Sequence, residues 1–205
     1  MTAAYNYLTC TLGRGRKAWA DFAGHVRSSL VSEVATAGGE VVGLFQGQLG
    51  FASNEAVVLL RRPERSRHAP MLVAGPKAIA VQMEALTPTV RPADTKKLKS
   101  GGIYVHRWFT VDAEKVADFI DLSNRAWQNF EGSYDTEIFG LFTAEAGEQD
   151  VRNEERRLLL LTWYASHGVW ETSRDQTRDP AGLFVKRHEL TRSTIGRSSL
   201  AVPLT

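Results

Sequence analysis

One strand-like segment of the chain carries the side chains best suited to binding a small molecule. Successive side chains of a strand point to opposite faces, so Tyr104, His106 and Trp108 share one face and Arg107 lies on the other. A guanidinium keeps its charge at physiological pH, and burying it alone is very costly. Arg107 must therefore reach solvent or be paired. Its partner is either an anionic or carbonyl ligand, or a protein carboxylate such as Glu137.

The neighbouring histidine and tryptophans also allow two interpretations. His106 either acts as a general acid or base, or it is a structural histidine of the core. No Asp or Glu that could orient it stands nearby in the sequence. Large aromatic residues usually fill cores, but one or two that face an interior cavity would suit a flat or apolar ligand. We predict a ligand site without an assigned catalytic residue, formed by Tyr104, His106, Arg107, Trp108, Glu137 and Trp163.

Other reactive constellations in the sequence are incomplete. His167 and Glu171 have the i, i+4 spacing of half a metal site, but no second histidine pair completes it. The segment 13–17 has the place of a phosphate-binding loop and lacks its third glycine and its Gly-Lys-Ser/Thr ending. Cys10 has no histidine close in sequence. We expect no metal and no cofactor.

The composition excludes several other classes of protein. The 205 residues include 25 basic and 23 acidic side chains, a formal net charge of +2, which is too balanced for a nucleic-acid-binding surface. The N-terminus does not have the pattern of a secretory signal, and no apolar run approaches the ~18 residues of a membrane span. Cys10 is the only cysteine, so no intrachain disulfide can form. We expect a soluble cytoplasmic protein.

An internal repeat organises the chain. A shift of 97 positions superimposes Ala20-Asp21-Phe22 on Ala117-Asp118-Phe119, and Gly43-Leu44-Phe45 on Gly140-Leu141-Phe142. It also aligns Glu40 with Glu137 and Gly50 with Gly147, which makes eight identities without a gap. Self-similarity at a fixed period indicates a duplicated structural unit.

Each copy predicts the same series of elements. In the first copy, strands are expected at 5–12, 41–45, 56–61 and 81–86, and helices over 19–30 and within 63–80. Gly38-Gly39 should end the first helix. In the second copy, strands are expected at 103–111, 137–143, 158–165 and 199–203, and helices over 116–130 and from 167 to 175. A charged hairpin at 147–157 and a linker at 88–102 complete the series.

The order βαββαβ in both copies predicts an α+β fold. Two ferredoxin-like modules, at 1–94 and 102–205, would form a tandem dimeric α/β-barrel. A module of this kind leaves one apolar face of its sheet bare, and the second copy can cover that face. The interior between the two sheets is then the expected place for a ligand.

The second copy resembles the NIPSNAP family. The residues that carry the resemblance are the strand Gly102–Val111 with its following helix, and the segments Glu137–Phe142 and Leu159–Tyr164. In the first copy, Gly43-Leu44-Phe45 and residues 54–60 stand in the corresponding places. Arg107 matches the strand arginine of the family, whereas Val105 stands where the family usually carries an acid.

The resemblance implies membership of the dimeric α/β-barrel group, which includes monooxygenases and haem-binding relatives of chlorite dismutase. It favours a NIPSNAP-like protein that binds a small organic molecule in the barrel interior and forms a homodimer or larger homo-oligomer. Two alternatives stay open: a cofactor-independent monooxygenase or isomerase that uses His106 or Arg107, or a structural scaffold with a filled barrel. A haem would need His167 or His188 as its axial ligand.

Overall fold

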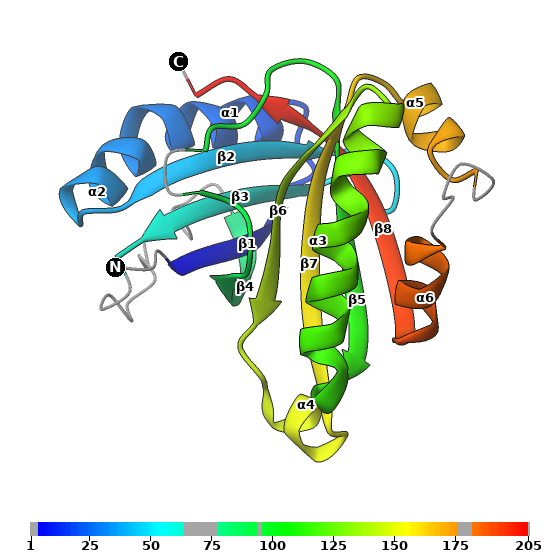
Figure 1. The fold of residues 1–205 in the computed structure, drawn as a ribbon. Helices are drawn as coiled ribbons and strands as arrows, with labels where there is room; N and C mark the ends of the chain where they lie inside the picture. The colour runs from blue at the N-terminus through cyan, green and yellow to red at the C-terminus, as the bar shows by residue number, and fades with distance from the viewer. Residues whose placement is uncertain (1–3, 64–77, 94–95, 176–181, 205) are drawn as a thin grey trace. The chain divides into compact units, whose positions relative to one another are not determined.

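The computed structural model describes residues 4–63, 78–93, 96–175 and 182–204 (Figure 1). The chain divides into two compact units. The first comprises residues 1–87 together with 197–205, and the second comprises residues 88–196. The end of the chain thus belongs to the first unit. In the modules expected at 1–94 and 102–205, it belonged to the second.

The first unit is built on an antiparallel sheet in the order β4-β1-β3-β2, and the end of β8 continues it beside β2. Its strands are β1 (Ala4–Leu12), β2 (Glu40–Gly47), β3 (Glu55–Arg62), β4 (Ala78–Pro88) and the last residues of β8 (Thr191–Val202). Leu8 lies opposite Val58 of β3 on one side and Met83 of β4 on the other. The four predicted strands of this copy are confirmed.

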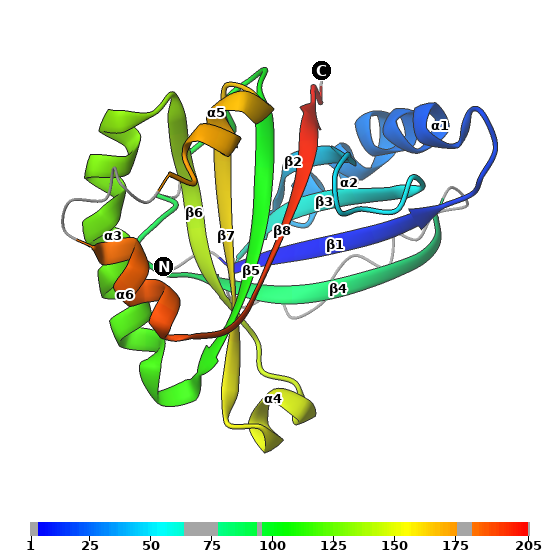
Figure 2. The same ribbon diagram turned by 90° about the vertical axis from the view of Figure 1, so that its right-hand side faces the viewer.

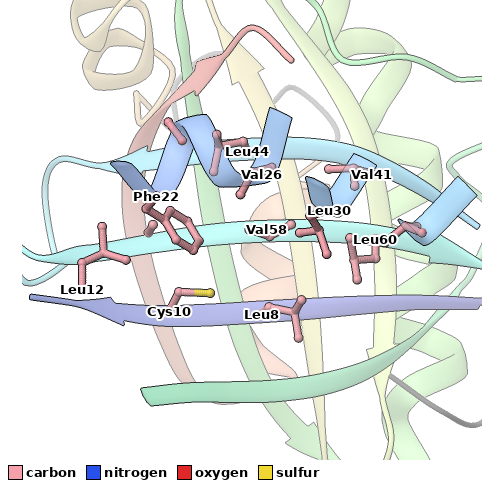
Figure 3. Close-up of a cluster of buried hydrophobic side chains, with 13 residues drawn as sticks. Leu8, Cys10, Leu12, Phe22, Val26, Leu30, Val41, Leu44, Val58 and Leu60 are labelled. Atoms are coloured by element: carbon pink, nitrogen blue, oxygen red, sulfur yellow. The ribbon is translucent and has the colours of Figure 1, made fainter. Parts of the chain in front are cut away.

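One interrupted helix covers this sheet. It consists of α1 (Ala18–His25), a π-helical turn η1 (Val26–Leu30) and α2 (Val31–Thr36). Its apolar side chains pack against strand residues, as Figure 3 shows for Phe22 and Val26 near Leu44. Gly38 has a φ of +76°, a conformation that glycine adopts at low cost, so the predicted helix end is confirmed. The helix expected within 63–80 falls outside the described residues, except that residues 78–80 begin β4.

The second unit repeats this strand order as β8-β5-β7-β6. Its strands are β5 (Ile103–Asp112), β6 (Thr136–Ala144), β7 (Glu155–Tyr164) and the first residues of β8. In both units the fourth strand flanks the first, and the third lies between the first and the second. This order is that of a ferredoxin-like unit, so the predicted α+β class is confirmed, and the described strands have the same order in both units.

Helices cover one face of the second sheet. Their bounds are η3 (Ala113–Lys115), α3 (Val116–Ser133), α5 (His167–Thr172) and α6 (Leu183–Glu189). Figures 1 and 2 both show α3 and α6 along the same side of this sheet, and the two helices are in contact. Phe119, Trp127 and Phe130 of α3 are buried there. They cover the apolar face that a half-buried sheet must shield from water.

Two segments differ from their expected structure. The hairpin expected at 147–157 contains a short helix, α4 (Glu148–Arg152). The last strand begins at Thr191 rather than at Ser199. Its first residues are polar and exposed, so they lack the apolar alternation from which a strand is predicted. No helix in the part of the chain that the structure describes is long and apolar enough to cross a membrane.

Candidate functional site

A cavity of about 540 Å³ lies in the second unit, between the sheet and the helices that cover it. Its floor comes from the strands and includes Arg107 and Phe109 of β5 and Leu160, Thr162 and Tyr164 of β7. Positions i, i+2 and i+4 of a strand share one face, and this face is the one that the helices cover. The strand period thus places Arg107 in the cavity lining together with the apolar core.

Aromatic side chains supply much of the cavity wall. Phe130 of α3 lies 5.3 Å from Phe184 of α6 and 6.2 Å from Tyr164, between ring centroids, and both ring pairs are close to edge-on. Trp127 of α3 and Trp170 of α5 also line the cavity. Aromatic pairs favour such edge-to-face packing. The wall is therefore apolar, and its rings can contact the body of a flat ligand.

Arg107 is half-buried in this lining. No hydrogen bond or ion pair joins its side chain to a residue that the structure describes. Leu160, directly opposite on β7, offers no charge. The alternative partner Glu137 is instead ion-paired with Lys96. The guanidinium is thus a cation at the cavity without a carboxylate partner among the described residues.

Two further arginines line the cavity, and they differ from Arg107. Arg187 of α6 is 5% exposed, and its guanidinium contacts the rings of Phe109, Phe119 and Phe184. Its Nη1 lies 3.5 Å from the Ser123 hydroxyl. Arg174, by contrast, is exposed at the rim. Arg187 therefore helps to hold α6 in place.

The cavity has a positive electrostatic character around Tyr164, which is 3% exposed. Burial raises the pKa of its phenol, because desolvation disfavours the phenolate. The charge of Arg107, the Ser173 hydroxyl and the charges of Arg187 and Arg174 act in the opposite direction. Tyr164 is a neutral hydroxyl at neutral pH. Three guanidiniums and one carboxylate, that of Asp175, line the cavity, and this excess of positive charge favours an anionic occupant.

Five of the six predicted site residues lie on the opposite face of the sheet. Tyr104 of β5, Trp163 of β7 and Glu137 of β6 are direct neighbours across the three strands. His106 is fully buried opposite Leu161. Trp108 is half-buried opposite Leu159. Arg107 is therefore the one predicted residue that lines the described cavity, and a site between the two sheets stays a prediction.

The chain's own linker contacts three of these five side chains. The Tyr104 hydroxyl donates to the Lys99 carbonyl over 3.0 Å, and Trp163 Nε1 donates to the Gly101 carbonyl over 2.8 Å. Lys99 Nζ lies 3.5 Å from the centroid of the Trp163 ring. Lys96 forms the ion pair with Glu137. Burial raises the pKa of Tyr104. The residues before β5 thus hold this end of the sheet.

Sequence reasoning missed most of the cavity wall. From the sequence, Trp127, Tyr164 and Trp170 are interpreted as aromatic residues of the core. That interpretation gives no reason to place them around a ligand. Arg187 did carry a signal, because it stands four residues after Leu183, on the apolar side of a short helix. A charge on such a stripe indicates either a buried partner or a ligand.

The two histidines considered as haem ligands lie in different places. His188 of α6 lines the cavity and is exposed. His167 of α5 does not line it, and its ring centroid lies 6.2 Å from that of Trp170. His188 is thus the one histidine in this lining that could serve as an axial ligand.

Comparison with known proteins identifies the fold. No family model and no curated protein matches the chain in sequence. A solved structure of a monooxygenase candidate from Fusobacterium nucleatum is similar, with a TM-score of 0.63 and 8% identity, over 98% of this chain and 93% of that one. An uncharacterized ferredoxin-fold protein from Listeria monocytogenes, related to antibiotic biosynthesis monooxygenases, has a TM-score of 0.52 and 10% identity over 99% and 96%.

A heme-binding protein from Thermus thermophilus is also similar, with a TM-score of 0.54 and 12% identity over 99% of this chain and 92% of that one. At such low identities these similarities concern the fold alone. They show that the chain has a ferredoxin-like fold.

Proposed function

We propose that the chain binds a small organic anion in the cavity of its second unit, with Arg107 as the main contact. The observation that carries this proposal is the half-buried Arg107 guanidinium, which has no hydrogen bond or ion pair with the described residues. A guanidinium cannot lose its proton to escape the cost of desolvation. A carboxylate or phosphate group of a ligand offsets that cost, and it can accept two parallel N–H bonds from the arginine.

The other features of the cavity support the same class of ligand. Its volume, about 540 Å³, lies within the range of small-molecule sites, about 300 to 1,000 Å³. Tyr164 offers a neutral hydroxyl beside Arg107, and Phe130 and Phe184 offer apolar rings. An acid with an apolar body thus matches both parts of the lining.

The proposal extends to family and assembly. The strand arginine of the NIPSNAP family corresponds to Arg107, which supports a NIPSNAP-like ligand-binding protein. Proteins of the dimeric α/β-barrel group commonly associate, and we propose that this chain forms a homodimer or a larger homo-oligomer. Each subunit of that assembly is one chain with its two units.

An enzyme of the monooxygenase or isomerase kind is the second candidate. It is favoured by the descriptions of solved structures with this fold, among them a monooxygenase candidate. Oxygen uptake in the presence of an acid that binds the cavity would support it, and binding without turnover would favour the simple binder. A structural scaffold, the third possibility, predicts no binding at all.

The test compares Arg107→Gln with a matched control, Arg125→Gln, which removes an exposed arginine of α3 outside the cavity lining. Aromatic and aliphatic monocarboxylates are titrated by calorimetry. A hydrogen bond to a charged group contributes ~1.5 to 3 kcal/mol, so Arg107→Gln should weaken binding by about 10- to 150-fold. The control should bind like the wild type.

The stability of the empty protein separates ligand binding from a structural role. Because Arg107 has no partner among the described residues, Arg107→Gln should change the unfolding free energy by less than about 1 kcal/mol. A loss of ~3 to 5 kcal/mol would indicate a broken buried ion pair and would refute the proposal. A Soret shift on addition of hemin that His188→Ala abolishes would identify a haem site instead.

A further inference from the structure

One hydroxyl on the cavity floor has no hydrogen-bond partner within the described part of the chain. Thr162 of β7 lines the cavity and is 3% exposed, and no hydrogen bond joins its side chain to a described residue. Its oxygen does not belong to the fully enclosed, unpartnered atoms of these residues. A hydroxyl that is buried without a partner is costly, and native structures rarely contain one.

The geometry of the strand directs this hydroxyl into the cavity. Leu160, Thr162 and Tyr164 stand at alternate positions of β7, and all three line the cavity. Side chains of a strand stand roughly perpendicular to the sheet. The oxygen of a threonine is attached to Cβ, so it stays on the same face of the sheet in every rotamer.

Packing alone does not require a threonine at this position. The residues directly opposite Thr162 are Val105 of β5 and Ile138 of β6, and both are apolar. Valine has the same branched shape as threonine and also favours strands, and it would bury no hydroxyl. An occupant of the cavity therefore explains this hydroxyl better than the core does.

Arg107 and Thr162 are diagonal neighbours on the adjacent strands β5 and β7 (Figure 2). Arg107 lies opposite Leu160, whereas Thr162 lies opposite Val105, two positions along. Cα atoms in this arrangement are about 7 to 8 Å apart, a distance that a long side chain spans. Burial raises the pKa of Tyr164, and the charge of Arg107 is the largest effect that opposes this rise. The guanidinium thus extends along the floor toward Thr162 and Tyr164.

This arrangement puts a hydroxyl beside the group that binds the acid. A carboxylate that accepts two parallel bonds from a guanidinium directs both of its oxygens toward the arginine. The next atoms of the ligand are those on the carbon beside the carboxylate. An oxygen on that carbon can accept a hydrogen bond from the Thr162 hydroxyl, and an alcohol there can also donate one.

We propose that the ligand is a 2-hydroxy or 2-oxo acid with an apolar body, whose 2-oxygen bonds the Thr162 hydroxyl. Arg107 binds the carboxylate, and Phe130 and Phe184 contact the apolar body. This inference rests on the proposed function, because it assumes that Arg107 binds the acid. It adds Thr162 as a specificity-determining residue and names the chemical class of the ligand.

Three acids with one skeleton isolate the 2-oxygen. The carbon beside the carboxylate is CH₂ in 3-phenylpropionate, CH–OH in 3-phenyllactate and C=O in phenylpyruvate. Calorimetry gives their dissociation constants, with both enantiomers of phenyllactate, for the wild type, Arg107→Gln, Thr162→Val and Thr162→Ser. Valine keeps the branched shape and removes the hydroxyl, whereas serine keeps the hydroxyl. Thr110→Val is the matched control, because Thr110 lies on the opposite face of β5, outside the cavity lining.

We expect phenylpyruvate or one enantiomer of phenyllactate to bind the wild type about 2- to 10-fold more tightly than phenylpropionate, the range of one neutral hydrogen bond. The tighter of the two distinguishes a 2-oxo from a 2-hydroxy ligand. The preference should fall to about onefold in Thr162→Val and persist in Thr162→Ser and in the control. Phenylpropionate should bind Thr162→Val as it binds the wild type. The wild-type comparison needs no variant, so it tests the inference even where a substitution impairs folding.

The outcomes separate the two levels of the argument. If all three acids bind the wild type equally well and depend on Arg107, the 2-oxygen contact is refuted and the proposed function stands. An equal loss of affinity for all three acids in Thr162→Val also refutes this contact, because the hydroxyl would then bond the carboxylate itself. A preference that persists in Thr162→Val refutes it as well. If no acid binds the wild type, or Arg107→Gln binds all of them as tightly as the wild type, the proposed function itself fails.

The stability of the empty protein excludes a structural role of the hydroxyl. Removing an unpartnered hydroxyl should leave the Tm of Thr162→Val equal to that of the wild type or raise it. A lower Tm of this variant would show that the hydroxyl has a partner within the protein, and it would overturn the assignment of Thr162 to the ligand.

Discussion

The buried arginine of the cavity wall offers a sharp test of how α6 is held in place. Arg187 is 5% exposed, and its guanidinium carbon lies 4.9, 5.1 and 5.5 Å from the ring centroids of Phe184, Phe109 and Phe119. All three distances lie within the ~6 Å range of a cation–π contact. The three rings belong to α6, β5 and α3, so this one side chain joins three elements.

The expected cost of Arg187→Ala follows from two terms. A desolvated cation–π contact is worth ~2 kcal/mol, and three contacts that share one cation are not additive. Truncation also removes the buried stem and leaves a cavity, as in a large-to-small core substitution that costs ~2 to 5 kcal/mol. The variant no longer has to desolvate the guanidinium when it folds, and this saving offsets part of the loss of stability. We expect a net loss of about 3 kcal/mol.

Urea denaturation followed by circular dichroism measures this loss, and a thermal melt should show a decrease in Tm of about 6 to 12 °C. Arg187→Met restores the volume without the charge and should recover about half of the loss. Lys186→Ala, an exposed neighbour in α6, is the control and should stay within ~0.5 kcal/mol of the wild type. An Arg187→Ala protein as stable as this control would refute the structural role of Arg187.

Two further predictions concern the linker glycines and the assembly. At Gly102, φ is +61° and a Cβ would lie 2.2 Å from the Tyr164 carbonyl oxygen, whereas Gly101, with φ +70°, has open space. Gly101→Ala should lower the free energy of unfolding by only the ~1 kcal/mol that a left-handed backbone costs an alanine. Gly102→Ala should lower it by at least twice as much, as measured by urea denaturation. Equal losses in the two variants would contradict the close contact at Gly102. Light scattering should give a mass above the 22.7 kDa of one chain, and a 22.7 kDa particle at working concentration would contradict the proposed homo-oligomer.

Periodicity and repetition in the sequence predicted most of the elements. The apolar stripe from Trp19 to Leu30 indicated a helix, and the structure has one there. The helix contains a π-helical turn, which the periodicity of the sequence did not predict. The 97-residue repeat predicted two units with the same strand order, and the two sheets have it. The beginning of β8 was missed because Arg192, Ser193 and Thr194 show no apolar alternation.

The candidate site was predicted less completely. Alternation correctly placed Arg107 and His106 on opposite faces, because the side-chain period of a strand depends only on the local backbone. Alternation alone did not indicate which face would enclose a cavity. That depended on where α3, α5 and α6 pack on the sheet. The partner of Glu137 was likewise undetermined, since Lys96 lies 41 positions away in the chain.

The sequence by itself determined the order of the strands, the first helix of each unit and the facing of the side chains of β5, since hydrophobic period and turn residues are local properties. Only the tertiary structure decided the cavity. Arg107, Trp127, Tyr164 and Arg187 stand on four different elements, and the packing of α3, α5 and α6 on the sheet brings them to one lining. Their proximity arises from contacts between residues far apart in the chain, and no local pattern of residues encodes such contacts.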